Sequence, residues 1–431
     1  MTISSSMLRF VLASIGLVMI IAIAAPRPAV ARGEMNGYDS TKGLAPKDDS
    51  LTKERGGKDG VRPDIARSLK DAQDANQQQN WTAARAKLDE ADAVSDKAPI
   101  EVFYINVTRA TTDKGAGDLS GAAKALAAAL ETGKANPDQA LVMMANITNL
   151  YIAAKDYPAT VLWSQRYAKA GGKDPAVSVL VIQAEYLSGD YAGAAREGQA
   201  AIDAAEQAHQ KPTEDQLQLV GNCFQKLNND AGYTSVLEKL VTFYPTPQYW
   251  ADLIAHVARK PGFPGRLMLD IYRLQHATGA LITSNQYTDM VELDLQEGIS
   301  SEAKAIADEG AAKGLVAKPL QNKATAAAAE DRKKLDRDEK EAAGMKDGNL
   351  LISIGYTYIG FADYQKGIAA LEQGIAKGGL KHPEEARQEL GIAYFQAGQA
   401  EKAIATFDSV SGTGPAGDVA RLWAMRMKQG I

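Results

Sequence analysis

The sequence predicts an all-α protein built from an array of helical hairpins, and three features of the chain indicate this fold. Alanine is abundant in stretches such as GAAKALAAAL and NKATAAAAE, and it is the residue that most favours helix. From Pro63 onward, apolar residues recur at helical spacing in blocks of roughly 12 to 15 residues. Short polar or glycine-containing breaks separate these blocks, as in paired helices joined by tight turns. One hairpin cannot bury its apolar face alone, so we expect the hairpins to stack.

The first 31 residues have the features of a secretory signal. Arg9 supplies a short positive region, an apolar stretch follows it, and Ala29-Val30-Ala31 gives the small-x-small pattern that precedes a cleavage site. We therefore predict that 1–31 is a signal peptide and that the protein is exported to the periplasm or cell envelope. The alternative is an uncleaved membrane anchor, because the apolar stretch is close to the shortest length that spans a bilayer.

The segment after the predicted signal and the net charge of the chain limit the kinds of function that we expect. Residues 32–62 are rich in Gly, Lys and Asp with almost no large apolar side chains, which predicts a flexible leader. The whole chain has a net charge of −5, and loss of the signal with Arg9 and Arg27 makes it more acidic. This charge argues against nucleic-acid binding. The single cysteine, Cys223, lies in an apolar stretch, so we expect a small buried core residue and no internal disulfide.

The clearest hairpin lies near the C-terminus, in the sequence EEARQELGIAYFQAGQAEKAIATFDSVSGTGP. Its marker residues are Leu390, Gly391, Tyr394, Gly398, Ala403, Phe407 and Pro415. This order resembles the tetratricopeptide repeat, in which Leu-Gly and Tyr in a first helix precede Gly, Ala, a bulky apolar residue and a closing Pro. The small residues let two helices approach closely, and the proline is expected to end the second helix.

Earlier parts of the chain repeat this pattern less completely. The preceding unit has Ile354-Gly355, Tyr358, Asp363-Tyr364, Gly367 and Leu371, and an upstream unit has Val220-Gly221, Phe224 and Pro245. Weaker copies keep the turn and the small residue that follows it, with turns at Asn80-Trp81, Gly117-Asp118, Asp156-Tyr157, Gly189-Asp190-Tyr191 and Gly298. The resemblance implies a right-handed superhelical solenoid of tetratricopeptide-like hairpins.

The resulting layout has four parts after the leader. A repeat array covers 63–317, with an atypical unit at 245–282 where two prolines separate the helices. A charged helix or hinge is expected at 318–347. Two well-matched units cover 348–416, and a capping helix covers 417–431. In that helix, Leu422, Trp423 and Met425 are expected to face the array, and Arg421, Arg426 and Lys428 to face outward.

We expect no catalytic residue, no cofactor and no metal site. The four histidines, His209, His256, His276 and His382, are scattered and lack the spacing of metal ligands. Glu292 and Asp294 are the one carboxylate pair that we considered for catalysis. They lie on different faces of a predicted helix, so they would not converge on one bond.

The resemblance also indicates where a partner would bind. In this family the first helix of each hairpin lines a concave face, and residues that point away from the Gly and Tyr core positions face the groove. The residues selected in this way are Asn149, Gln218, Asn222, Gln225, Lys226, Tyr356 and Gln388. Amide side chains can hydrogen-bond an extended peptide, and Tyr356 would supply an apolar anchor. The basic clamp of some family members is absent, because Ala145 and Gln218 stand where Lys would be needed.

The leading hypothesis is therefore a periplasmic or envelope scaffold that presents a concave groove to a protein or peptide partner. The alternative is a polysaccharide-acting enzyme of the α/α toroid type. Such an enzyme needs a closed ring and two acids in an aromatic-lined cleft, and an aromatic content of 6% argues against it. A third possibility is a membrane-tethered assembly factor, if the signal segment is retained.

Overall fold

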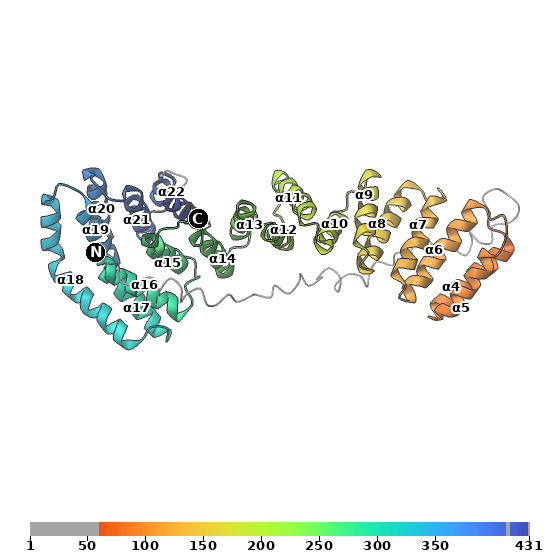
Figure 1. Cartoon of the computed structure of the whole chain (residues 1–431), viewed down its shortest axis with the longest axis horizontal. Coiled ribbons are helices and arrows are strands. Elements are labelled where there is room, and N and C mark those ends of the chain that lie inside the picture. Colours follow the sequence, from red (N-terminus) through yellow and green to blue (C-terminus); the bar gives the residue numbers. More distant parts are fainter. Residues whose placement is uncertain (1–59, 411–413, 430–431) are drawn as a thin grey trace. The chain divides into compact units, whose positions relative to one another are not determined.

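The computed structural model describes residues 60–410 and 414–429, so the predicted signal peptide and nearly all of the predicted leader lie outside it. Within these ranges the chain contains helices and no strands, and consecutive helices pack in pairs (Figure 1). The predicted all-α fold class is confirmed. The chain divides into two compact units between Asn229 and Asp230. No helix in the described ranges combines the length and the apolar character needed to cross a membrane.

Unit 1 consists of four helical hairpins and one further helix. The hairpins pair α4 (Pro63–Gln77) with α5 (Trp81–Asp92), α6 (Pro99–Gly115) with α7 (Leu119–Glu131), α8 (Pro137–Ala153) with α9 (Tyr157–Lys169), and α10 (Pro175–Ser188) with α11 (Tyr191–Gln207), and α12 (Glu214–Lys226) follows. The core continues from hairpin to hairpin. For example, Phe103, Leu126 and Ile147 belong to one buried cluster that spans α6, α7 and α8. Cys223 is buried in α12, and burial raises the pKa of its thiol to about 11.

The four hairpins of unit 1 share one kind of turn. A residue with left-handed backbone ends the turn, and the next residue is an Asn or Asp that caps the second helix. The left-handed residues are Gln79, Gly117, Lys155 and Gly189, and the caps are Asn80, Asp118, Asp156 and Asp190. Each cap accepts a hydrogen bond from the backbone N–H three residues later, which satisfies a donor that the helix leaves free. The turn residues recognised in the sequence are therefore helix caps.

Proline has a different role from the predicted one. Pro63, Pro99, Pro137 and Pro175 are the first residues of the four first helices of unit 1. The missing N–H of proline costs no intrahelical hydrogen bond at this position. Pro415, which we expected to close the last hairpin, likewise begins a new helix. The prediction that Pro415 ends the second helix of the last hairpin was therefore wrong.

Unit 2 contains the remaining helices. They are α13 (Asp230–Phe243), α14 (Pro247–Ala258), α15 (Met268–Ala277), α16 (Ser284–Glu297), α17 (Ser300–Ala312), α18 (Lys318–Gly344), α19 (Asn349–Gly360), α20 (Tyr364–Lys377), α21 (Pro383–Gln396), α22 (Ala400–Asp408) and α23 (Pro415–Lys428). A short 3₁₀ turn, Gly265–Leu267, precedes α15. The atypical stretch 245–282 thus forms α14 and α15, and its two central prolines lie in the connection between them.

Most of the charged stretch 318–347 forms one long helix, α18. Ala324, Ala328 and Leu335 are buried on it, and it packs on α16, α17 and α19. Next to it, α17 packs directly on α19, where the Ser301 hydroxyl donates to the carbonyl of Thr357 at 2.9 Å. This helix therefore does not separate two arrays, and the division of the chain lies at residues 229 and 230 instead.

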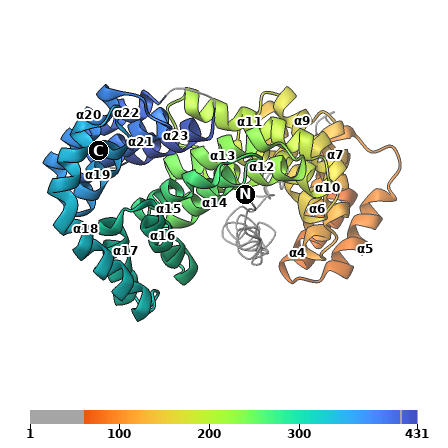
Figure 2. The same cartoon turned by 60° about the vertical axis from the view of Figure 1, so that its left-hand side comes forward.

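The last helix of unit 2, α23, contacts helices near the start of the unit, which closes the unit into a bundle (Figure 2). Helix α23 packs on α21 and α22, and also on α14 and α15. The ammonium of Lys260 lies 2.7 Å from the Asp418 carboxylate, and Arg266 pairs with Glu385 of α21 at 2.6 Å. Unit 2 is therefore not an open stack of hairpins.

Helix α23 is more deeply embedded than a capping helix. Leu422 and Trp423 are buried as predicted, whereas Met425 is only partly buried and Met427 is buried in its place. Arg421 and Arg426, which were predicted to face outward, are only partly exposed. Arg421 bonds Glu238 and Asp418, and Arg426 donates to the carbonyl of Ala277 at 3.0 Å. The closure of the unit accounts for this difference.

Candidate functional site

Four of the predicted groove residues lie on one side of α12. Gln218, Asn222 and Gln225 follow the i, i+4, i+7 spacing that places side chains on one helix face, and Lys226 lies beside them. Asn222 is half-buried and the other three are exposed. Asn222 makes no side-chain hydrogen bond within the described residues. The packing side of the helix is separate and carries residues such as Leu217 and Val220, which are fully buried.

The neighbouring first helices continue this surface. Asn149 is exposed on α8, where its amide donates to the carbonyl of Ala145 at 3.0 Å. Val142 lies seven residues earlier on the same side of α8 and is 38% exposed. Helix α10 packs against both α8 and α12 and presents Gln183 and Leu187, which are four residues apart (Figure 1). Leu187 is 50% exposed, so the surface mixes amides with apolar side chains.

Every second helix from α4 to α12 carries an uncharged polar side chain at the same position. In α4, α6, α8, α10 and α12, the residue eight positions before the start of the next helix is an amide or a hydroxyl. These residues are Gln73, Thr111, Asn149, Gln183 and Asn222, and we call them the polar ladder. The Nε2 donor of Gln73 is buried without a hydrogen-bond partner. Part of the hydrogen-bonding capacity of the ladder residues is therefore unused within the described residues.

Sequence reasoning identified Asn149 and Asn222 but missed the other three ladder residues. Each of the four hairpins has a cap residue, such as Asp190, from which the same position can be counted back to Gln183. The caps were recognised as turns, but they were not used as a register for the first helices. Counting back from each cap residue would therefore have identified the ladder residues in the sequence.

Two of the predicted groove residues are not accessible. Tyr356 is 1% exposed and Gln388 is 0% exposed, because α19 and α21 face α15 inside the closed bundle of unit 2. Their assignment to a partner-binding groove was therefore wrong. The Gln388 amide instead donates to Asp270 at 2.8 Å, and the Tyr356 ring lies 4.0 Å from the guanidinium of Arg273.

Arg273 is the centre of a buried ion cluster in unit 2. It donates to Glu302 Oε2, at 2.6 Å from Nη2 and 2.9 Å from Nε, to Glu302 Oε1 at 3.2 Å from Nε, and to Asp270 at 2.9 Å. Asp294 is 0% exposed and lies 4.0 Å from the guanidinium. Glu292, two residues earlier, is exposed, so these two carboxylates do lie on different faces of α16. We define the cluster as Asp270, Arg273, Asp294, Glu302, Tyr356, Gln388 and Glu389.

The carboxylates of this cluster outnumber its single cation, which shifts their protonation. Burial raises the pKa of Asp270 to about 6 and that of Glu389 to about 8, although Arg273 opposes both shifts. Burial and the adjacent Glu302 raise the pKa of Asp294 well above its ordinary value. Neither Asp294 oxygen receives a hydrogen bond from a donor group. A proton on Asp294 would supply a donor to Glu302 and remove the unpaired charge.

These shifts predict that the stability of unit 2 falls as pH rises. The folded state holds protons on Asp270, Asp294 and Glu389 at pH values where the unfolded chain has already released them. The free energy of unfolding should therefore decrease between about pH 4 and pH 8, by at most about 1.4 kcal/mol per pH unit for each group. Urea titrations at several pH values would measure this slope. Asp294→Asn should flatten it, and an unchanged slope in that variant would contradict the assignment.

The chemistry of the cluster is structural in this arrangement. The described residues contain no group of His, Cys, Asp and Glu side chains suited to hold a metal ion. The side chains of Arg273 and Asp294 are only 3% and 0% exposed, so a substrate cannot reach them. The polar ladder of unit 1, in which Asn149 is exposed and the other four residues are partly exposed, is therefore the better candidate for recognition of another molecule.

The constant register of cap, turn and ladder across consecutive hairpins defines a repeat. The chain is a helical repeat protein, and its hairpins resemble the tetratricopeptide repeat. No protein-family model matches the sequence, and no curated protein matches it. The chain has low similarity to solved structures of helical proteins.

Three solved structures illustrate the similarity. A structure of Naa15/Naa10 bound to HypK-THB has a TM-score of 0.23 and 12% identity over 82% of this chain and 70% of that one. The structure of the pentatricopeptide repeat protein PPR10 from maize has a TM-score of 0.30 and 15% identity, over 98% of this chain and 61% of that one. The structure of the APC/C hetero-tetramer Cut9-Hcn1 has a TM-score of 0.22 and 11% identity, over 81% of this chain and 87% of that one. At these values the comparisons add no argument about function.

Proposed function

We propose that this repeat protein is an exported scaffold that binds an extended segment of a protein partner along the polar ladder of unit 1. The observation that carries the proposal is the recurrence of uncharged hydrogen-bonding side chains at one position of five consecutive first helices. An amide offers both a donor and an acceptor, which is what each peptide group of an extended chain requires. Solvation alone does not require the same position to be polar and uncharged in each of these five helices.

The spacing of the helices suits such a ligand. Packed helices lie about 8–10 Å apart, and an extended chain rises about 3.3 Å per residue. One ladder residue would therefore meet the peptide backbone about once in three residues. Val142 and Leu187 are exposed on the same helices and would contact apolar side chains of the partner. Lys226 at the end of α12 would favour an acidic residue there.

The enzymatic alternative has one observation in its favour. Unit 2 closes on itself and gathers several carboxylates, which are two features that a helical polysaccharide-acting enzyme needs. However, the Asp294 carboxyl is fully buried and Arg273 nearly so, and a glycan could contact them only if the helices separated. The scaffold function is therefore the better supported proposal.

Export to the periplasm or cell envelope forms part of the proposal. It is supported by the charged, apolar and small-residue pattern of 1–31. Determining the N-terminal sequence of the protein purified from its own cells would test it. A start at Arg32 would support cleavage and export, whereas a start before it would favour the membrane-tethered alternative.

The ladder is tested by removing it without disturbing the core. A variant with Asn149→Ala, Gln183→Ala and Asn222→Ala should bind the partner on the order of a hundredfold more weakly, because each hydrogen bond contributes about 1 kcal/mol. The matched control changes three exposed amides outside the ladder, Gln77→Ala, Gln165→Ala and Gln207→Ala.

The partner is first captured from the cell envelope by light crosslinking, and its affinity is then measured with the purified proteins. A partner held by the parent and the control but lost by the ladder variant, with equal helicity in all three, would support the proposal. Equal affinity for all three proteins would place the binding site elsewhere on the molecule. Binding of the same partner to the exposed surface of unit 2 would also place the binding site away from the ladder.

A further inference from the structure

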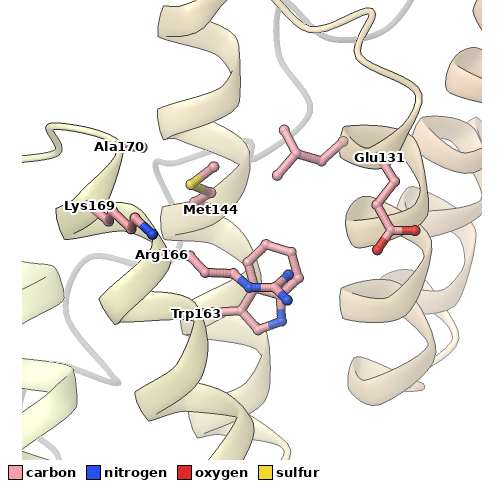
Figure 3. A pocket seen from close by; sticks show the side chains of 7 residues that line it. Glu131, Met144, Trp163, Arg166, Lys169 and Ala170 are labelled. Carbon is pink, nitrogen blue, oxygen red and sulfur yellow. The ribbon is translucent and has the colours of Figure 1, made fainter.

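A pocket of about 340 Å³ lies between α7, α8 and α9 (Figure 3). Leu130 of α7, Met144 of α8 and Trp163 of α9 supply apolar walls, and Arg166 and Lys169 of α9 supply two cations. Met144 and the ladder residue Asn149 are five positions apart on α8. At about 100° per residue, this places them about 140° apart around the helix. The pocket and the polar ladder therefore open on different sides of unit 1.

The two cations beside the pocket are not neutralised by the protein. Arg166 and Lys169 are exposed, and neither makes a side-chain hydrogen bond or ion pair within the described residues. Arg166 lies over the ring of Trp163, 4.5 Å from its centroid, and this contact holds the guanidinium at the edge of the pocket. Figure 3 shows this stacking and places Glu131 on the opposite helix. Glu131 is the only acid in the lining, so the pocket carries an excess of positive charge.

We propose that this pocket binds a peptide segment of a protein partner in which a large apolar side chain is followed directly by Asp or Glu. The volume is at the lower end of the range for small-molecule sites, about 300–1,000 Å³, so it suits one side chain of a larger molecule. The apolar side chain would contact Met144, Leu130 and the free edge of Trp163. The carboxylate would pair with Arg166, whose planar donors remain available while its face covers the indole.

Fluorine NMR of the purified protein labelled with 5-fluorotryptophan would test this binding directly. The chain has four tryptophans, and Trp163→Phe assigns the resonance of interest. The probe is the peptide acetyl-Gly-Phe-Asp-Gly-amide, compared with the same peptide carrying Asn in place of Asp or Gly in place of Phe. We expect a saturable shift of the Trp163 resonance with the Phe-Asp peptide, and affinity about tenfold weaker for the other two.

The matched variants use two pairs of cations with the same spacing. Arg166→Glu with Lys169→Glu should reduce the affinity by at least about tenfold. Arg67→Glu with Lys70→Glu makes the same charge change three positions apart on the exposed side of α4 and should leave it unchanged. An unchanged Trp163 resonance, or equal affinity for the Asp and Asn peptides, would overturn the proposal. The ladder variant tests a separate site, so either proposal can fail while the other holds.

Discussion

Replacing Arg273 with methionine is expected to lower the free energy of unfolding of unit 2 by about 3–5 kcal/mol at neutral pH. The side chain of Arg273 is 3% exposed and bonds two carboxylates, Asp270 and Glu302. Methionine keeps most of the apolar volume but removes the only cation of the buried ion cluster. The carboxylates would then be buried without a partner, which costs more free energy than the loss of an exposed ion pair.

Urea unfolding followed by tryptophan fluorescence would measure this effect, because Trp250 and Trp423 report on unit 2. The control is Arg266→Met, which removes an exposed pair with Glu385 and should cost less than about 1 kcal/mol. Equal losses in the two variants would show that the buried cluster is not what holds these helices together. Adding Asp270→Asn and Glu302→Gln to Arg273→Met should restore part of the lost stability, since the unpaired charges are then gone.

The hairpins of unit 1 could be predicted because their determinants are local. A left-handed residue, an Asn or Asp cap and a run of apolar residues at helical spacing each act within a few positions of the chain. Gly189 and Asp190, for example, specify the turn between α10 and α11 without help from distant residues. The prolines that begin helices are equally local, and only the predicted role of Pro415 was wrong. Pro99, Pro137 and Pro175 begin first helices, and so they mark the repeat directly.

The closure of unit 2 could not be predicted in the same way, because it depends on contacts between residues far apart in the chain. Asp270 and Gln388 are separated by 118 positions. In the sequence, Asp270, Arg273 and Glu302 look like ordinary charges on helical surfaces, and nothing local shows that other helices cover them.

Tyr356 illustrates the difference between local register and tertiary environment. It lies eight residues before α20, which is the position that Asn149 and Asn222 occupy before their own second helices. All three residues therefore occupy the same register position. Asn149 is exposed in unit 1, whereas Tyr356 is covered by Arg273 of α15. Exposure depends on the packing of the whole unit.

Replacing Trp423 with alanine is expected to cost about 3–5 kcal/mol, the second large effect that the structure predicts. Trp423 is 1% exposed, stacks on Phe407 with centroids 5.7 Å apart, and contacts Phe395 at 5.6 Å. The change removes the largest buried side chain of α23, the helix that packs on both ends of unit 2. Met425→Ala, at a partly buried position of the same helix, should cost much less.

Hydrogen exchange would show whether the loss of stability in Trp423→Ala is confined to helices near α23 in the chain or affects the whole closed unit. If α23 joins the ends of unit 2, Trp423→Ala should speed amide exchange in α14 and α15 as well as in α21 and α22. The first pair lies well over a hundred residues earlier in the chain, and it meets α23 through contacts such as that of Arg426 with the carbonyl of Ala277. In an open stack of hairpins, loosening the last helix would affect only the hairpin beside it. Faster exchange confined to α21 and α22 would therefore argue that the contact between the two ends contributes little to the stability of unit 2.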